Sequence, residues 1–289
     1  MRYRWNTILL IGWGLTVVPV VCAVGQKNAV SEKEEIKKSF RLADNDHRQL
    51  VVDNINGEIN VVGYDGDTIE LVAHKEIKAE SDEKIKEAKQ EVKLEIKEER
   101  NKIILYVDAP WRSGNGVNYR GWHYQGYDVI YDFDLKVPHK ISLYLKTVNH
   151  GKVIVQSVEG EFEVKNVNAG IEMSDINGPA LVKTVNGPIK VSFSRNPGSE
   201  CSFKTVNGKI EVVLHDGLNA DMKFKTFNGK VYTDFDVSSL PREDRTVEER
   251  KGTLRIYRRG NSNTVRVGMG GPEFSFDTLN GSVYVLKQD

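Results

Sequence analysis

Residues 203–214 read Phe-Lys-Thr-Val-Asn-Gly-Lys-Ile-Glu-Val-Val-Leu, and the pattern of this stretch decides the fold. Its Thr-Val-Asn-Gly motif, at 205–208, is followed by alternating apolar and polar residues. A chain that repeats one small unit is built by stacking that unit, so the repeat determines the architecture. Further copies of the motif, some of them looser, lie at 54–57, 147–151, 157–160, 166–170, 175–178, 184–187, 226–229 and 278–281.

The glycines that end these motifs fall into two alternating series. The first series has steps of 19, 17, 21 and 21 residues and contains Gly151, Gly170, Gly187, Gly208 and Gly229. The second series has steps of 18, 20 and 19 residues and contains Gly160, Gly178, Gly198 and Gly217. Two turns per coil of 18–21 residues are typical of a β-solenoid, a parallel β-helix-like stack in which each layer consists of strand, turn, strand and turn.

We therefore expect an all-β protein whose repeats form a β-solenoid, with N-terminal strands and one short helix beside it. The alternative is an antiparallel β-sandwich or meander, because Asn-Gly is also the preferred two-residue hairpin turn. Pro179 and Pro188 directly follow a motif glycine, where a hairpin strand would need an N–H that proline lacks. This placement of proline favours the solenoid.

The Asn and Gly residues of the motifs are predicted to be structural. Asn-Gly tolerates the positive φ that tight corners demand, and Asn side chains stacked along a corner can hydrogen-bond to one another. We expect such stacking at Asn186, Asn207 and Asn228. The full set of predicted turn residues is Asn56, Gly57, Asn177, Gly178, Asn186, Gly187, Asn207, Gly208, Asn228, Gly229, Asn280 and Gly281.

Residues 1–25 have the three parts of a secretory signal peptide: a basic start, an apolar stretch from Ile8 to Val21, and small residues around Ala23. We expect an exported protein of the periplasm, cell envelope or cell surface. An uncleaved anchor is one alternative, and a lipid anchor at Cys22 is another, although Val21 stands where lipoprotein sites carry Gly, Ala or Ser. Contact with a membrane is expected only through the signal or such an anchor.

The remaining chain divides into three predicted parts. Residues 26–45 are polar and charged, and we interpret them as a linker whose residues 31–35 are able to start a short helix. Residues 46–137 form a β-rich part with a helix over 80–91, capped by Ser81 or Asp82, and an aromatic loop. Residues 138–289 form the repeat, with an insertion at 237–272.

The loop at 111–127 concentrates aromatic residues beside Arg and Asn. Exposed aromatic rings can stack on sugars or contact a partner protein. The alternative is that the rings fold back over the end of the sheet. The candidate ligand-binding residues are Trp111, Arg112, Tyr119, Trp122, Tyr124 and Tyr127.

Composition and motifs disfavour several classes of function. Formal net charge is zero, without a basic nucleic-acid face. No Cys/His cluster has metal-ligand spacing, and Cys201 is expected to be a small buried core residue. The chain lacks a Gly-x-Ser-x-Gly elbow and a His-Glu-x-x-His helix. We therefore expect no catalytic residue, metal or cofactor.

From Val129 onward the sequence resembles a bacterial putative-adhesin family of β-strand-repeat proteins, a domain of unknown function. The resemblance rests on the strand at 129–137 with Pro138, on Lys-Thr-Val-Asn at 146–149 and on the successive Asn-Gly units. The helix at 81–89 and the first motif copy also look like that family, so the resemblance covers residues 45–289. It implies an exported protein with a solenoid-like domain and no known catalytic residues.

These features favour a non-enzymatic protein of the cell envelope or surface, an adhesin or interaction scaffold whose partner is a protein or a glycan. The alternative is a glycan-active enzyme that uses a solenoid groove. Asp132 and Asp134 share one strand face and His139 and His150 lie near the first coil, but carboxylates at this spacing usually belong to a solvated face.

Overall fold

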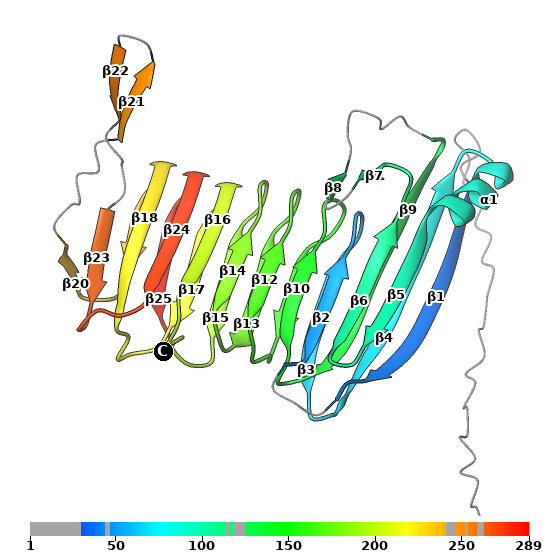
Figure 1. Ribbon diagram of the computed structural model, residues 1–289, viewed down its shortest axis with the longest axis horizontal. Helices are drawn as coiled ribbons and strands as arrows, with labels where there is room; N and C mark the ends of the chain where they lie inside the picture. The colour runs from blue at the N-terminus through cyan, green and yellow to red at the C-terminus, as the bar shows by residue number, and fades with distance from the viewer. Residues whose placement is uncertain are drawn as a thin grey trace, which may run out of the picture.

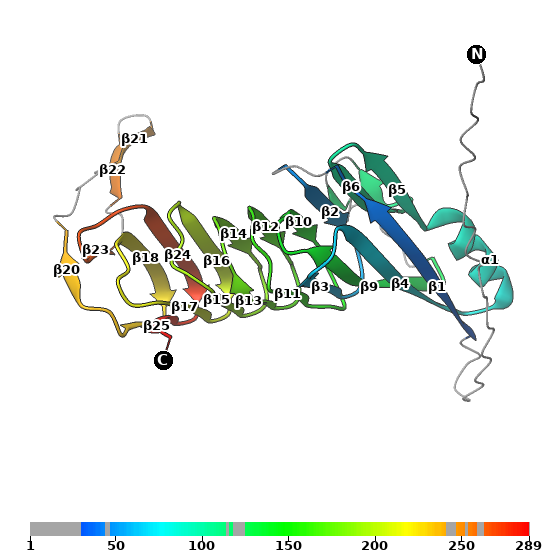
Figure 2. The same cartoon turned by 90° about the horizontal axis from the view of Figure 1, so that it is seen from below.

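The computed structural model describes residues 30–43, 47–113, 116–117, 125–240, 247–251, 254–258 and 263–288. This part of the chain is all-β apart from one helix, α1 (Asp82–Glu91). Most of its strands form two large sheets that face each other along an elongated molecule (Figure 1, Figure 2). The predicted signal peptide, residues 1–25, lies outside the described residues.

The two large sheets, here named A and B, are open at both ends. In spatial order, sheet A contains β1 (Val30–Arg41), β4 (Thr68–Ala79), β9 (Tyr127–Pro138), β3 (Ile59–Tyr64), β11 (Val153–Gln156), β13 (Ile171–Ile176), β15 (Ile189–Phe193), β17 (Ile210–Leu214), β25 (Val283–Lys287) and β19 (Val231–Thr233). Sheet B contains β20 (Val237–Ser239), β23 (Asn263–Val267), β18 (Ala220–Asn228), β24 (Glu273–Asn280), β16 (Cys201–Asn207), β14 (Ala180–Lys183), β12 (Phe162–Lys165), β10 (Ser142–Lys146), β2 (Gln49–Asp53), β6 (Lys102–Asp108) and β5 (Lys93–Glu99). Two short ribbons complete the described strands, β7 (Arg112–Ser113) with β8 (Gly116–Val117), and β21 (Val247–Lys251) with β22 (Leu254–Arg258).

From β10 to β17 the chain alternates between the sheets. Each strand pairs in parallel with the strand two places further along the chain, so Leu143 lies opposite Phe162 and Val164 opposite Val182. The Asn-Gly turns therefore join strands of different sheets. They do not join antiparallel neighbours, as hairpin turns in a meander would.

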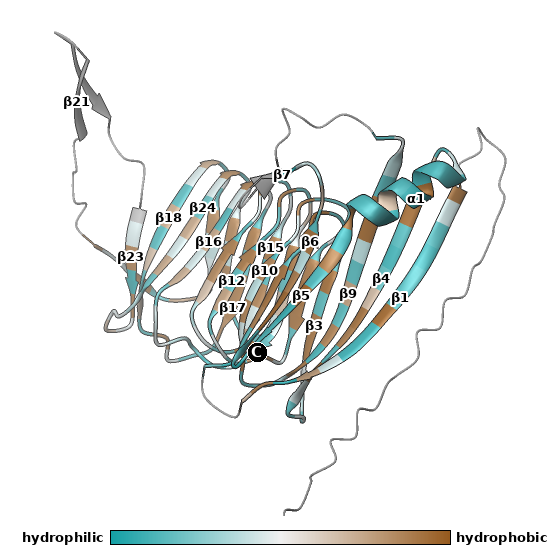
Figure 3. Ribbon diagram, turned by 45° about the vertical axis from the view of Figure 1, so that its right-hand side comes forward, coloured by the Kyte–Doolittle hydropathy of each residue, from teal (hydrophilic) through white to brown (hydrophobic). Residues whose placement is uncertain are grey.

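The core lies between the two sheets and is made of layers of similar side chains. Ile171, Ile189 and Ile210 occupy successive strands in register and are fully buried. Burial of each such side chain contributes about 1.5–3 kcal/mol. The alternation of apolar and polar residues along the strands is visible in Figure 3.

In sheet B the same layering uses aromatic rings. The Phe203 and Phe276 rings stack at 5.4 Å between centroids, and Phe224 continues the stack at 5.0 Å from Phe276.

Residues 46–137 share both sheets with the repeat. Strand β2 pairs in parallel with β10, and β3 pairs in parallel with β11. Residues 49–64 therefore add one strand to each of the two sheets, which continue without interruption across the boundary that the sequence suggested at 137/138.

The predicted helix is present, and a hairpin follows it. Ser81 caps α1 and accepts a hydrogen bond from the backbone N–H of Lys84 at 3.4 Å, while Ile85 and Ala88 are buried. Strands β5 and β6 pair antiparallel. A narrow apolar stripe therefore suffices to fix the helix on the molecule.

The prediction of a polar linker over 26–45, with a helix start at 31–35, is wrong for its described residues. Strand β1 occupies this stretch and pairs antiparallel with β4 over its whole length. Its charged residues find partners across the pair, such as Lys33 with Glu76 at 3.5 Å, while Phe40 is buried. Polar residues at some inward positions hide the strand alternation in the sequence.

The predicted insertion at 237–272 contains four short strands. Strand β23 pairs antiparallel with β18, and β20 pairs with β23. After this excursion the chain returns to the middle of the stack. Strand β24 lies between β16 and β18, and β25 lies between β17 and β19.

Candidate functional site

One corner of the stack, where sheet B strands turn into sheet A strands, holds a continuous line of amides. We name it the asparagine ladder. Each Asn Nδ2 donates to the Oδ1 of the previous Asn, at distances of 2.6–3.1 Å. In stack order its members are Asn56, Asn149, Asn168, Asn186, Asn207, Asn280 and Asn228.

The ladder has a direction. Its donor end is closed by Asp128, whose Oδ1 accepts from Asn56 Nδ2 at 3.2 Å. At the other end stands Asn228, which donates to Asn280 at 2.8 Å. Aligned amides polarise one another, so such a chain is stronger than isolated pairs.

The residue two places before each ladder Asn closes the corner from inside. Thr205 Oγ1 donates to the carbonyl of Gly187 at 3.0 Å, and Thr278 Oγ1 donates to that of Gly208 at 3.1 Å. Asn166 uses its amide in the same way toward Gly151, at 3.0 Å. These side chains are buried or nearly so, and they satisfy carbonyls that would otherwise lack a partner.

The motif glycines are required for close stacking more often than for positive φ. Among the predicted turn glycines only Gly57 and Gly178 have positive φ, at 123° and 125°. A Cβ on Gly208 would lie 2.0 Å from the carbonyl oxygen of Gly187, and one on Gly281 would lie 1.9 Å from that of Gly208. Asn177 belongs to the other corner of the stack, where its carbonyl accepts from Gly160 N–H at 2.9 Å.

Some of the predicted ligand-binding residues lie outside the described residues, and the others pack against the protein. Tyr119, Trp122 and Tyr124 lie outside the described residues. Tyr127 is buried and its hydroxyl donates to the Glu91 carboxylate. Trp111 is partly buried, packs against the core and lies 6.2 Å from the Tyr127 ring.

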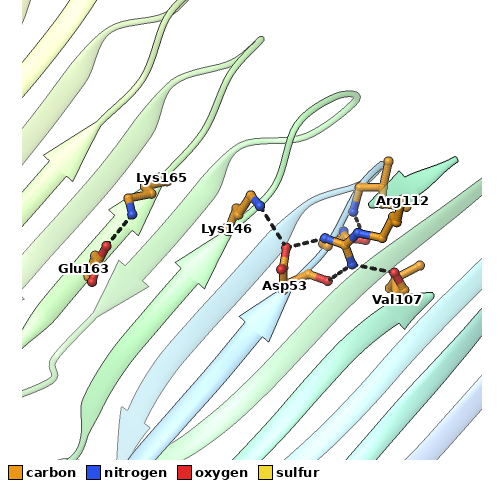
Figure 4. Close-up of polar contacts among 8 residues, drawn as sticks. Asp53, Val107, Arg112, Lys146, Glu163 and Lys165 are labelled. Carbon is orange, nitrogen blue, oxygen red and sulfur yellow. Dashed lines mark hydrogen bonds and ion pairs between the residues drawn. The ribbon is translucent and has the colours of Figure 1, made fainter. Parts of the chain in front are cut away.

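Arg112 is also buried, which contradicts its predicted exposure to a ligand. Only 2% of its side chain is exposed, and its guanidinium donates to the Asp53 carboxylate at 2.5 Å and to the carbonyls of Asp53 and Val107 (Figure 4). Its guanidinium carbon also lies 4.2 Å from the centroid of the Tyr106 ring. Arg112 therefore joins β2 to β6 and is a structural residue, like Tyr127.

On the outward face of sheet B, lysines occupy equivalent positions on several strands. The sequence analysis did not identify them as candidate site residues. We name Lys146, Lys165, Lys183, Lys204 and Lys225 the lysine row. The first four lie opposite one another on adjacent strands, and Asp277 stands in register between Lys204 and Lys225. Adjacent strands are about 4.8 Å apart, so the first four lysines recur at that spacing, and Lys225 lies two strands from Lys204.

Carboxylates close to the lysine row compensate part of its positive charge. Asp277 lies 3.1 Å from Lys204 and 3.7 Å from Lys225, and Asp53 lies 3.6 Å from Lys146. Lys165 pairs with Glu163 of its own strand (Figure 4). Lys183 is exposed and has no ion pair with the described residues.

Sheet A arranges its charges differently. Glu172, Lys190 and Glu211 follow one another in register on adjacent strands, so opposite charges alternate. Lys209 lies 2.8 Å from Glu211 and lowers the pKa of that carboxyl. The signal for the contrast was available in the sequence, because a lysine directly precedes the motif at 146, 165, 183, 204 and 225.

A shallow groove of about 420 Å³ lies on the same face of sheet B. Tyr144, Leu181, Ser202 and Ser275 line it, each two residues before the level of the lysine row. Glu161 lies 3.5 Å from the Tyr144 hydroxyl, and burial raises the pKa of that hydroxyl. The groove adds an aromatic surface and carboxylates beside the lysines.

Lys75 is the buried charge at the N-terminal end of the stack. Its Nζ donates to the carbonyl of Val92, the C-cap of α1, at 3.1 Å and lies 5.3 Å from the Tyr131 ring centroid. Burial lowers the pKa of this amine, and Glu34 lies opposite it on β1. A cation at a helix C-terminus is stabilising, so Lys75 ties β4 to the helix.

The remaining titratable side chains with candidate chemistry have structural contacts within the sheets. No group of three or more His, Cys, Asp and Glu side chains among the described residues could hold a metal ion. Asp132 accepts the Glu58 backbone N–H at 2.7 Å, and Asp134 accepts from Asn60 at 3.0 Å, so both act within the sheet. Cys201 is buried, and burial raises the pKa of its thiol to about 11.

No helix within the described ranges is long and apolar enough to cross a membrane.

Several solved structures resemble this one over most of its length. A putative cell adhesion protein from Clostridium sporogenes is 12% identical, covers 89% of this chain and 100% of its own, and has a TM-score of 0.42. A putative adhesin from Bacteroides fragilis is 10% identical, with coverage of 88% and 97% and a TM-score of 0.39. A putative lipid binding protein from Parabacteroides distasonis is 9% identical, with coverage of 88% and 97% and a TM-score of 0.24.

The names of the first two structures agree with the family that the sequence resembles. No family model matches the chain, and no curated protein matches it.

Proposed function

We propose that this chain is an exported, non-enzymatic protein of the cell envelope or surface, an adhesin or interaction scaffold, that binds a negatively charged partner. The lysine row is the observation that carries the proposal. Like charges directly opposite one another on neighbouring strands destabilise a sheet, and the alternating charges of sheet A are an arrangement that avoids this cost. An anionic partner that spans several coils would compensate the row.

We further infer that the repeats form a two-sheet β-solenoid, which supports this role. Parallel in-register strands and the asparagine ladder hold each coil at a fixed distance from the next. The lysines are therefore held at a regular spacing before a partner arrives. Preorganisation of this kind reduces the cost of binding.

Export is proposed from residues 1–25, whose basic start and apolar stretch are typical of a signal peptide. Fractionation of producing cells, with N-terminal sequencing of the protein recovered, tests it. Recovery of the full-length chain in the cytoplasmic fraction would contradict this part of the proposal.

A pair of matched triple variants tests the binding function. The first changes Lys165, Lys183 and Lys204 to Gln on sheet B, and the control changes Lys152, Lys190 and Lys209 to Gln on sheet A. Retention on isolated envelope material and on a synthetic polyanion is measured at low and high salt. We expect the sheet B variant to bind at least about tenfold more weakly, and its remaining binding to depend less on salt.

The control variant should bind within about twofold of the unchanged protein. Equal losses in both variants would indicate a diffuse effect of net charge and would overturn the assignment to the lysine row. Circular dichroism on each variant separates loss of binding from loss of fold.

A further inference from the structure

At the end of the stack that contains β18 and β19, the two sheets end differently. Beyond β18, sheet B continues with β23 and β20. Sheet A stops at β19, and no described strand pairs with its outer edge. Strand β23 therefore lies beside the sheet B half of the last coil, whereas no described strand covers its sheet A half.

The open edge of β19 presents backbone groups in a defined order. Lys230 O accepts from Val283 N at 2.9 Å, and Asp234 N donates to Val285 O at 3.2 Å, so these residues face β25. In a parallel strand, alternate residues direct their backbone groups to opposite sides. The N–H and C=O groups of Val231 and Thr233 therefore point to the open side.

The corner of the last coil also has acceptors that every earlier coil uses. Asn Oδ1 atoms along the ladder accept from the next coil, and Gly187, Gly208 and Gly281 carbonyls accept from the next Thr. At the end of the stack, Asn228 Oδ1 and the Gly229 carbonyl accept no hydrogen bond from any described residue.

Exposed apolar side chains mark the same place. Phe227 is 76% exposed, Tyr232 45% and Val231 38%. Their counterparts one coil inward are less exposed or buried, since Leu279 is 47% exposed and Val283 is fully buried. The end of the stack thus resembles an interior coil surface without its covering coil.

The molecule itself contains a coil that was added from a distant part of the chain. Asn280 donates to Asn207, which is 73 residues away, and accepts from Asn228, which is 52 residues away. Its strands keep the common register on both sides, with Thr278 opposite both Thr205 and Thr226. Coils of this stack need only a matching motif, not sequence adjacency.

We propose that the open end formed by 226–233 binds an extended segment of another polypeptide, which adds in parallel as one more coil. The segment carries Asn at the corner, whose Nδ2 donates to Asn228 Oδ1, and Thr two residues earlier, whose hydroxyl donates to the Gly229 carbonyl. Its following strand pairs with Val231 and Thr233. This interaction does not depend on the lysine row or on its partner.

A labelled peptide with the sequence of residues 205–214 serves as the probe, and its binding to the purified protein is followed by fluorescence anisotropy. We expect saturable binding that is lost with a scrambled peptide and weakened roughly fivefold by Asn207→Ala in the peptide. Val231→Pro in the protein should weaken binding about tenfold, because it removes an N–H from the open edge only.

Two further variants keep the result interpretable. Asn228→Ala should weaken binding roughly fivefold through loss of the corner acceptor, whereas Met269→Ala, which trims another exposed apolar side chain, should leave it unchanged. Thermal melting checks that each variant is folded. Binding that is equal for the native and scrambled peptides, or unaffected by both Val231→Pro and Asn228→Ala, would overturn the proposal.

Sedimentation of the protein alone tests whether a second copy of this chain occupies the edge instead. A monomer that binds the peptide supports a partner polypeptide. A dimer that Val231→Pro dissociates would overturn the proposal, because a second copy of the chain would then fill the end.

Discussion

At the Asn-Gly corner, which joins sheet B to sheet A, five residues separate the next sheet A strand from each of Lys165, Lys183, Lys204, Lys225 and Asp277, and six residues follow Lys146. At the opposite corner, which joins sheet A back to sheet B, the connections at 157–161, 177–179, 194–200 and 215–219 differ in length, and 234–272 forms the long excursion. One corner is held by the asparagine ladder and by glycines in contact with the next coil. The length of the chain is therefore kept more closely at the Asn-Gly corner, and most of the variation lies at the opposite corner.

We expect an insertion to give the largest difference in stability between the two corners. Three residues, Gly-Ser-Gly, placed between Asn207 and Gly208 would displace Gly208 from its contact with Gly187 and separate the Gly208 carbonyl from Thr278 Oγ1. We expect this variant not to fold. The same three residues between Gly198 and Ser199 should cost only about 0.6 kcal/mol, because loop closure depends weakly on length.

Urea unfolding followed by circular dichroism measures both insertions. A folded protein with the insertion at 207/208 would contradict the strict register of the Asn-Gly corner.

Glycine substitutions give a smaller and more local contrast. Gly208→Ala should cost about 3 kcal/mol or more, because its Cβ would overlap the Gly187 carbonyl oxygen. Gly198→Ala should be neutral or stabilise by about 0.5 kcal/mol, because no atom lies within 4 Å of a Cβ there and alanine restricts the unfolded chain. Similar melting temperatures for the two variants would show that the corners are equally tolerant.

Position along the ladder should matter less than the corner itself. Asn207→Ala removes two ladder hydrogen bonds and should destabilise by about 2 kcal/mol, whereas Asn228→Ala removes one and should cost about 1 kcal/mol. Denaturant midpoints of the two variants measure the difference. A larger loss for Asn228→Ala than for Asn207→Ala would contradict a ladder whose members contribute alike.

The effect that leaves stability unchanged concerns Cys201, which follows the loose connection at 194–200. Burial raises the pKa of its thiol to about 11, so the protonated form is favoured and only about one thiol in a thousand is ionised at pH 8. We expect iodoacetamide to label Cys201 at least about a hundredfold more slowly in the folded protein than in urea. Mass spectrometry of peptides separates it from Cys22, and fast labelling would show that the loose corner opens to solvent.

The repeat period and the stacking of Asn186, Asn207 and Asn228 follow from the sequence because both depend on spacing and local chemistry. The order of the coils does not. The motifs at 205, 226 and 278 are nearly identical, so local pairing is satisfied whichever of them are neighbours. Only the length of the connection at 234–272 distinguishes the arrangements.

Candidate site residues were harder to predict than strands. Arg112 and Tyr127 lie in a stretch rich in residues that are usually exposed. In the folded protein both side chains are buried and hydrogen-bond to residues distant in sequence, Arg112 to Asp53 and Tyr127 to Glu91. The lysine row precedes the motif by one position, and its significance arises from register between strands, which no single copy contains. Burial and register are properties of the assembled sheets.

The position of β24 and β25 has a consequence for the order of folding. The coil of β18 and β19 cannot meet its final neighbours until Glu273–Lys287 has been synthesised and has entered the space before it. Because its motif also fits directly against β16 and β17, a nascent chain can build a shorter stack first. A shorter stack of that kind would have to part and admit β24 and β25 before the final order of strands is reached.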